Sequence, residues 1–430
     1  MKKILLTTIV LFAVLTSIQA QSETTSFDVG GIKVIFKPTQ KNVINIRVYF
    51  RGGVTNYSSD KAGIEDLALE ATTQCGTQKY SANAFRDTCE KYGVLMYGNS
   101  SYDYGYIQVN CISKYFNKSW DLFTQALFSP TFNAADVSLL KTKAIATIRR
   151  YDTNPENRLT KLEMRNAFAT TPYKTDPGGT EETVNAFTAD DLKNYYQGLL
   201  NKQRMFIVVV GNLTKQELYE RILKSFDHIK SEPYTTPELI TPDFNDNKLM
   251  VDRRDLKINY VGAIMNAPDF SSHDFMPYRL AIAGLSGNLY SHIRSSQGLS
   301  SDPSAMTYLN KMPYTVMDAS TNDPQRVMMI MMNTLKSIQR TGYQEEWLQH
   351  IKNSYIIGNY INGQSASQIT NSLGLAEILG NWHYADDLPQ LVNMVTVEQM
   401  NYVINRYIIG MRWNYVGNVS AIEGFVVPKF

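Results

Sequence analysis

One helical face in the first third of the chain has the spacing, but not the residue types, of a hydrolytic zinc site. The segment GIEDLALEATTQCGT, residues 63–77, predicts a helix that ends near a Cys-Gly-Thr turn. Asp66, Leu69 and Glu70 stand at positions i, i+3 and i+4 and therefore share one face. Zinc hydrolysis requires two imidazole ligands and a carboxylate base on such a face. Leu69 accepts no proton from water, and neither neighbour is a histidine.

Other metal chemistry at this face is equally poorly supported. Asp66 and Glu70 alone supply too few oxygens for calcium, which takes roughly 6 to 8 ligands. Acidic residues also favour the first turns of a helix through its dipole, and Glu65 and Asp66 stand there. We interpret both as helix-start residues and predict no metal site. The histidines lie elsewhere and are interpreted as surface or packing residues: His228, His273, His292, His350 and His383.

The periodicities around this face predict an α+β fold. Alternating apolar and polar residues are typical of half-buried strands at residues 27–39, 42–53, 104–113 and 258–267, the last of which we expect to open the second half. Amphipathic spacing predicts helices at residues 82–93, 115–130, 134–151, 323–342 and 343–361. The Met328, Met329, Met331 and Met332 cluster is interpreted as core packing. Because strands and helices do not alternate strictly, we expect a mostly antiparallel or mixed sheet covered by helices in each half.

A faint internal repeat divides the chain into halves. MFIVVVGN at 205–212 resembles MRWNYVGN at 411–418, and a helical segment precedes each. Thr188 and Thr396 predict the N-caps of these helices, each with a partner three residues later that suits a capping box. Any protein with helices and strands repeats helix then strand, but the fixed order and matching positions favour a duplication. We therefore predict two similar domains.

A proline-rich segment at residues 231–247 marks the boundary between these domains. Pro233, Pro237 and Pro242 disfavour regular pairing and are typical of an extended connector. We predict an N-terminal domain at 21–230 and a C-terminal domain at 248–430. A chain of 430 residues is long enough for two or three domains of ordinary size.

Residues 1–20 have the features of an export signal. Lys2 and Lys3 precede an apolar run, and Ala20 offers a small residue for cleavage. The run is shorter than the roughly 20 residues that span a bilayer, and no later segment reaches that length. We expect a periplasmic protein, with secretion as the alternative, and no membrane span after export. Lys2 and Lys3 account for the net charge of +2, so the remainder is formally neutral, which argues against a nucleic-acid partner.

The cysteines allow at most one internal disulfide, because their number is odd. Cys75, Cys89 and Cys111 form no C-x-x-C pair, so the pattern is not that of a zinc knuckle or a thioredoxin-type motif. We favour buried thiols over a disulfide, since a chain of this length does not depend on disulfide cross-links for its stability.

The order of these motifs resembles the pitrilysin/insulinase-like metallopeptidases with an inverted zinc motif, in the branch of the mitochondrial processing peptidase and its small bacterial relatives. The resemblance is carried by GIEDLALE…CGT, then TPYKTDPGGTEETVNAFTADDL, then MFIVVVGN, and it covers nearly the whole chain after residue 20. It implies a duplicated, LuxS/metallopeptidase-like α+β fold. It also implies that two such two-domain units enclose a chamber for an extended peptide.

The resemblance identifies the residues that would carry the chemistry. The two zinc-binding histidines of the family fall on Asp66 and Glu70, and the general base falls on Leu69. The third ligand, a glutamate, falls near Thr147. The resemblance therefore implies no catalytic residue, no metal and no cofactor in this chain, with zinc only in a catalytic partner.

A second family motif lies in the C-terminal half. The segment GLSGNLYSHIRSSQGLSSDPSA resembles one whose Arg and Tyr hold the substrate backbone near zinc. Arg294 matches the Arg, while Ser301 stands in place of the Tyr. The resemblance thus implies that Arg294 and Ser301 are substrate-binding positions. The alternative for Arg294 is an ion pair with a surface acid.

These observations lead to three hypotheses. The leading one is a non-catalytic subunit of an exported heterodimer of the zinc-peptidase type. It would bind extended peptides by strand addition and contribute substrate contacts to a partner with an intact His-x-x-Glu-His motif. The second is a self-associating peptide-binding or scaffold protein without a peptidase partner. The third, which the missing ligands disfavour, is an active zinc protease.

Overall fold

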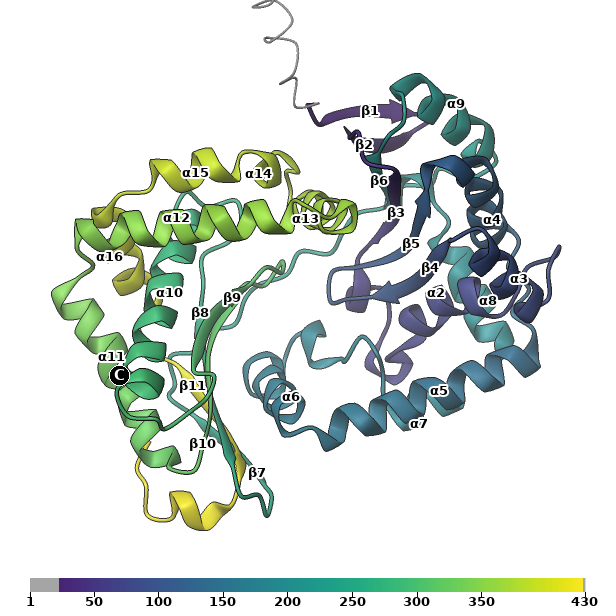
Figure 1. Cartoon of the computed structure of the whole chain (residues 1–430). Coiled ribbons are helices and arrows are strands. Elements are labelled where there is room, and N and C mark those ends of the chain that lie inside the picture. The colour runs from purple at the N-terminus through teal and green to yellow at the C-terminus, as the bar shows by residue number, and fades with distance from the viewer. Residues whose placement is uncertain (1–22, 428–429) are drawn as a thin grey trace, which may run out of the picture.

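The computed structural model describes residues 23–427 and 430, which form two α+β halves, each built on one sheet (Figure 1). The residues interpreted as an export signal lie outside this part of the chain. Among the helices of residues 23–427, none is long and apolar enough to cross a membrane. The predicted fold class, α+β with two similar domains, is confirmed.

The first sheet is mixed and has six strands in the order β1-β2-β6-β3-β5-β4. β2 and β6 run parallel, and the other neighbours are antiparallel. β4 and β1 are therefore its edges. The strands are β1 (Thr25–Val29), β2 (Ile32–Pro38), β3 (Val43–Arg51), β4 (Leu95–Ser100), β5 (Tyr104–Ile112) and β6 (Met205–Gly211).

Helices of the first half cover one face of this sheet and enclose the first core. Val48, Phe50 and Ile107 of the strands pack in one buried cluster with Leu67 and Leu122 of the helices. The helices of this half are α2 (Ile64–Gln74), α3 (Ala82–Lys91), α4 (Phe116–Phe128), α5 (Ala134–Thr153), α6 (Pro155–Phe168), α7 (Glu181–Ala186), α8 (Ala189–Leu199) and α9 (Lys215–Phe226).

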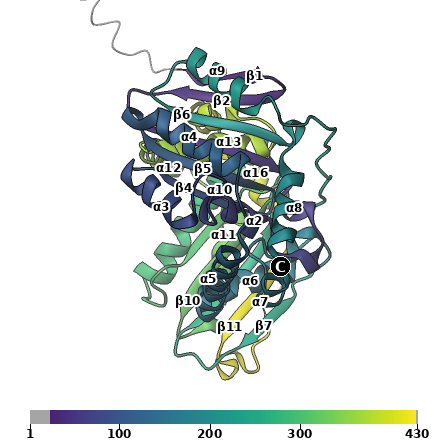
Figure 2. The same cartoon turned by 90° about the vertical axis from the view of Figure 1, so that its right-hand side faces the viewer.

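The second sheet repeats the plan of the first with five strands in the order β7-β11-β8-β10-β9. Its one parallel pair, β7 with β11, takes the place of β2 with β6. β9 is an edge strand, as β4 is in the first half. The strands are β7 (Leu249–Arg253), β8 (Asn259–Asn266), β9 (Ser304–Tyr308), β10 (Tyr314–Thr321) and β11 (Arg412–Gly417). Figure 2 shows β1 and α9 at one end of the molecule and β7, β10 and β11 at the other.

The prediction that residues 258–267 open the second half was wrong, because β7 comes before them. β7 is short, lies at the sheet edge and has no fully buried residue, so it lacks a strong apolar pattern. The helices of this half are α10 (Phe275–Leu289), α11 (Pro324–Thr341), α12 (Glu345–Asn362), α13 (Ala366–Ile378), α14 (His383–Asp386), α15 (Leu388–Met394) and α16 (Val397–Tyr407). A π-helical turn, Tyr290–Ser295, extends α10.

The predicted N-caps confirm the repeat at the level of single residues. The Thr188 side chain accepts a hydrogen bond from the backbone of Asp191, whose carboxylate accepts one in return. Thr396 and Gln399 form the same capping box at the start of α16. Each helix then leads into a fully paired strand, β6 or β11, so the same local signal begins the same unit in both halves.

One helix of each half packs on the sheet of the other half. α13 covers the face of the first sheet that the helices of the first half leave open (Figure 1). There Leu373 of α13 and Trp382, which follows this helix, pack against Tyr49 and Phe206. α6 lies on the second sheet, where Asn166 donates hydrogen bonds to the carbonyl oxygen of Trp413 and to Asn414. Because both faces of β6 are covered, all of its residues are buried, as expected for a central parallel strand.

The segment predicted as a linker contains no helix or strand, since α9 ends at Phe226 and β7 begins at Leu249. It is nevertheless packed against both halves. The Tyr234 hydroxyl donates to the backbone of Arg51 in the first half, and the N–H of the fully buried Phe244 donates to the Asn266 side chain in the second half. The connector therefore contributes to the contact between the halves.

The remaining packing expectations hold with one exception. The three cysteines are buried and unbonded, as predicted. Met328, Met331 and Met332 are buried in the second core, but Met329 is 42% exposed. Met329 points away because consecutive residues of a helix cannot all face the core.

Candidate functional site

The helix α2, which carries Asp66, Leu69 and Glu70 on one face, packs very closely against the edge strand β4. A Cβ on Gly98 of β4 would stand 2.2 Å from the backbone oxygen of Leu69, so only glycine allows this approach. The Leu69 side chain is fully buried and packs over Gly105 of β5. The position that the resemblance assigns to the general base is therefore occupied by a hydrocarbon side chain that contributes to the core.

Asp66 ties α2 to the end of β4. Its Oδ1 accepts a hydrogen bond from the Ser100 backbone N–H at 2.7 Å and from the Asn99 side chain at 3.0 Å. Burial raises the pKa of Asp66 to about 7, and the bond from Ser100 offsets part of that rise. The interpretation of Asp66 as a simple helix-start residue was incomplete, because sequence alone gives no view of β4.

Glu65 has a larger structural role than its position in the sequence suggested. The buried carboxylate accepts hydrogen bonds from the hydroxyl of Tyr195 at 2.6 Å, the amide of Asn56 at 2.8 Å and the hydroxyl of Ser100 at 3.0 Å. Burial raises the pKa of Glu65, while these donors offset part of the rise. Glu65 thus joins three segments of the first half at the base of α2.

Glu70 and Thr147 are the two remaining residues on which the resemblance places zinc ligands. Glu70 is half-buried; burial raises the pKa of its carboxyl and nearby Lys143 of α5 lowers it. Thr147 of α5 lines a cavity of 480 Å³, here named the first-half cavity. Ser100, whose backbone N–H donates to Asp66, also lines this cavity. Tyr308 and Asn310 of the second half line it as well. Thr147 and the end of β4 that Asp66 holds therefore line one cavity, whereas no residue of α2 is among its lining residues.

The residues of this site do not fit a zinc ion. Oδ1 of Asp66 already accepts two hydrogen bonds, Leu69 offers no ligand atom, and Thr147 offers only a neutral hydroxyl. Within residues 23–427, no group of three His, Cys, Asp or Glu side chains is arranged to hold a metal. Zinc sites take nitrogen, thiolate and carboxylate ligands in a closed or three-ligand arrangement, which is not available here.

Arg294 and Ser301 lie together, away from the α2 face. Arg294 belongs to the π-helical turn after α10, donates to the backbone oxygen of Ser301, and lies over the ring of Tyr290 at 5.2 Å. Both residues are exposed. Among the described residues no carboxylate forms an ion pair with Arg294. The alternative prediction, an ion pair with a surface acid, is therefore not met in this conformation.

Two family models match consecutive parts of the chain. Insulinase (peptidase family M16) matches residues 33–181, and the peptidase M16 inactive domain matches residues 186–355. The chain belongs to the peptidase M16 family. The placement of the family's zinc-binding positions on Asp66 and Glu70 of α2, and of its general base on Leu69, stays a prediction from the resemblance.

The curated relatives include M16 proteins named as proteases and one named as a non-peptidase. The zinc protease PqqE of Helicobacter pylori is 23% identical over 57% of this chain and 56% of its own length. The non-peptidase homolog YmxG of the same organism is 22% identical over 70% of both chains. A probable β subunit of the mitochondrial processing peptidase of Arabidopsis thaliana is 18% identical over 62% of this chain.

Solved structures of M16 proteins share the fold over nearly the whole chain. The peptidase M16 inactive domain from Pseudomonas fluorescens matches with a TM-score of 0.82, 16% identity and coverage of 92% of this chain and 98% of that chain. A protease from H. pylori matches equally well, with 18% identity. The periplasmic protease PqqL of Escherichia coli matches 93% of this chain but 47% of its own, so the present chain spans about half of PqqL and of PqqE.

Proposed function

We propose that this M16 protein is a non-catalytic subunit that binds extended peptides and completes the substrate site of a separate zinc-bearing subunit. The observation that carries the proposal is the arrangement of the α2 face, on which the resemblance places the family's metal-binding positions. Leu69 is buried, and Asp66 is committed to hydrogen bonds with Asn99 and Ser100. A face arranged in this way holds the peptide-binding edge in place and supplies no base for hydrolysis.

The peptide would bind at the free edge of β4. Among the described strands β4 pairs only with β5, so alternate backbone groups along its other side remain available to an added strand. Leu95 is 66% exposed and Tyr97 39% exposed on this strand, which gives an apolar surface for peptide side chains. Asp66 occupies the outward N–H of Ser100 and would mark the end of the bound strand.

The architecture of relatives supports a partner of the same fold. The chain matches the first half of PqqL over 95% of both, with 16% identity and a TM-score of 0.75. The whole PqqL chain is about twice as long, since the same match covers 47% of it. A second M16 unit as partner is therefore the natural counterpart. In the proposed assembly Arg294 would contact substrate next to the zinc of that partner, with both subunits in the periplasm.

The alternative function is a self-associating peptide-binding scaffold without a peptidase partner. It is favoured by one observation, the contact between Arg294 and the backbone of Ser301. In this conformation the guanidinium is bound within its own subunit, and Ser301 lacks the phenol that relatives would use. A stable homodimer that binds peptides and captures no zinc-bearing M16 protein would favour this alternative.

The test is affinity capture followed by reconstitution. The tagged full-length protein would be isolated from its native envelope, and the co-purifying proteins identified by mass spectrometry. We expect an M16 protein with His-x-x-Glu-His and peptide cleavage by the reconstituted pair. Arg294→Gln should lower that cleavage at least about tenfold, the order expected for a lost charge-assisted hydrogen bond. Arg340→Gln, an equally exposed arginine on α11, is the control. Repeated recovery of no such protein would contradict the proposal.

A further inference from the structure

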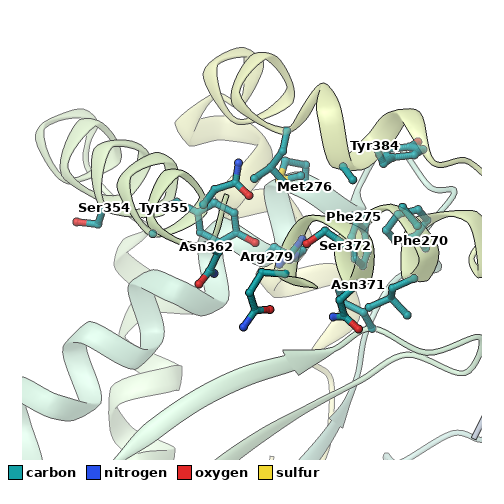
Figure 3. A pocket seen from close by; sticks show the side chains of 18 residues that line it. Phe270, Phe275, Met276, Arg279, Ser354, Tyr355, Asn362, Asn371, Ser372 and Tyr384 are labelled. Carbon is teal, nitrogen blue, oxygen red and sulfur yellow. The ribbon is translucent and has the colours of Figure 1, made fainter. Parts of the chain in front are cut away.

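The second half contains a cavity at the place equivalent to the first-half cavity. It has a volume of 510 Å³ and lies between α10, α12 and α13; we name it the second-half cavity (Figure 3). The spacing from the start of α5 to that of α6 equals the spacing from α12 to α13. α12 and α13 therefore repeat the α5–α6 pair, and the second-half cavity takes the place of the first-half cavity in this repeat.

Residues at matching helix positions line both cavities. Thr147 and Tyr151 of α5 line the first, and Gly358 and Asn362 line the second at the same positions of α12. Thr160 and Lys161 of α6 correspond in the same way to Asn371 and Ser372 of α13. The two cavities thus share one framework but present different side chains.

The second-half cavity contains an unneutralised cation. The Arg279 guanidinium lies over the rings of Tyr355 at 5.1 Å and Phe275 at 5.6 Å. Within the described residues it has no hydrogen-bond acceptor and no ion-pair partner, and no Asp or Glu lines the cavity. In the first-half cavity, by contrast, Lys161 is paired with Asp152 at 2.7 Å and with Asp176 at 3.3 Å.

A second polar group beside Arg279 also lacks a partner. The Tyr355 hydroxyl is buried and makes no hydrogen bond to any described residue. A buried hydroxyl without a partner costs free energy, and a ligand that accepts its hydrogen bond would recover that cost. Side-chain amides of Asn359, Asn362 and Gln368 line the same space, and Phe270 and Leu388 contribute apolar walls. The cavity therefore combines donors for an anion with an apolar surface.

We propose that the second-half cavity binds a carboxylate attached to an apolar side chain, held by Arg279 and Tyr355. A guanidinium donates two parallel hydrogen bonds to a planar carboxylate, and the single cation balances one negative charge. The volume lies within the range of ordinary ligand pockets, roughly 300 to 1,000 Å³. This inference goes beyond the proposed function and holds whether or not a peptidase partner exists.

The position of the cavity favours the C-terminal carboxylate of a peptide as the source. The turn after β9 contributes Leu309 to the second-half cavity and Asn310 to the first-half cavity. This turn is fastened to the first half, because the Lys311 N–H donates to Asp103 at 2.9 Å. Both cavities therefore flank one fixed turn between the halves, and a peptide bound along β4, as proposed above, would run toward this turn. A free acylated amino acid carries the same chemistry and is the other source.

Calorimetry on the whole protein tests the inference with matched ligands. The probes are a ten-residue peptide that ends in phenylalanine, its C-terminal amide, N-acetylphenylalanine and N-acetylphenylalanine amide. We expect each acid to bind at least about tenfold more tightly than its amide, the order expected for a charge-assisted hydrogen bond. Tight binding of the short acid would identify a free small ligand, and tight binding of the peptide acid alone would identify a peptide end. Equal binding of acids and amides, or no binding of either acid, would overturn the inference.

Two variants separate ligand binding from folding. Arg279→Met keeps an apolar stem over Phe275 and Tyr355 but removes the charge, and should abolish the preference for acids. Tyr355→Phe removes only the unpartnered hydroxyl, so it should leave thermal stability unchanged or higher while it weakens acid binding about threefold to tenfold. Arg340→Met on α11 is the control and should leave binding unchanged. Unchanged acid binding in Arg279→Met and Tyr355→Phe would contradict the assignment of these two residues.

Discussion

The two halves of this protein use one framework for two different cavities. In the first half, the polar residues around α2 are satisfied by one another, as in the bonds from Asn99 and Ser100 to Asp66. In the second half, Arg279 and Tyr355 face a cavity without partners among the described residues. Satisfied buried polar groups stabilise a fold, whereas unsatisfied ones cost free energy that a ligand can recover. The comparison contrasts a first half whose buried polar groups around α2 satisfy one another with a second half whose unpartnered groups are proposed to bind a ligand.

The largest effect is expected from Glu65, which joins α2 to the rest of the first half. Glu65→Ala leaves the donors of Asn56, Ser100 and Tyr195 without their acceptor. The free energy of unfolding should fall by about 3 kcal/mol, because several buried donors lose their partner at once. Urea unfolding measures this loss. Glu70→Ala, on the half-buried side of the same helix, is the matched control and should cost less than about 1 kcal/mol. Equal losses would show that α2 is not anchored through Glu65.

A smaller effect is expected at α13 and α6, the two helices that pack on the sheet of the other half. The side-chain contacts that hold these two helices differ. α13 is held by Glu377, which forms ion pairs with Lys33 at 2.7 Å and Arg51 at 2.8 Å. Glu377→Ala should cost about 2 kcal/mol, since the Lys33 side chain is 43% exposed and solvent screens part of its attraction.

The helix α6 provides the comparison for that variant. The side chain of its Asn166 makes only uncharged hydrogen bonds, so Asn166→Ala should cost about 1 to 2 kcal/mol. The loss from Glu377→Ala should shrink when sodium chloride rises from low concentration to about 1 M, because screening weakens ion pairs. The loss from Asn166→Ala should stay constant. Identical salt dependence in urea unfolding would contradict the assigned difference.

The smallest predicted effect concerns pH at the other crossing contact of α6. Glu163 and Asp318 are both buried beside Gly262, where a Cβ would stand 2.2 Å from the Glu163 oxygen and 2.8 Å from the Asp318 oxygen. Burial and the Asp318 charge raise the pKa of Glu163 well above its usual range, and burial raises that of Asp318 to about 6, with Asp302 adding to the rise. The folded protein therefore binds more protons than the unfolded chain, and its stability should fall as pH rises from about 4 through 6 and above.

Glu163→Gln tests this pH dependence. Glutamine cannot ionise but can donate to Asp318, so the variant should be more stable than the parent by about 1 kcal/mol at pH 8 and nearly equal to it at pH 5. The thermal midpoint across this range measures the difference. Glu156→Gln, an exposed acid on the same helix, should follow the parent at every pH. If Glu163→Gln kept the pH profile of the parent, the Glu163–Asp318 pair would not be the cause of the pH dependence.

The features predicted from sequence are those set by local spacing. Thr188 and Thr396 lie within three residues of their capping partners, and the strand periodicities are visible within single segments. The absence of a general base at Leu69 is likewise a local prediction, because a hydrocarbon side chain cannot take a proton from water wherever it lies, and it stays a prediction. The features missed depend on distant partners. Glu65 and Tyr195 are 130 residues apart. The same limit hid Arg279, since its isolation is defined by which residues surround it.

The measurement that tests the central claim most directly is metal content together with peptide cleavage by the purified protein. If the α2 face is a structural tie, the protein should hold no stoichiometric zinc after equilibration with excess zinc and gel filtration, and it should cleave no peptide by itself. One zinc per chain with peptide cleavage, both lost in Asp66→Asn and Glu70→Gln, would contradict the account.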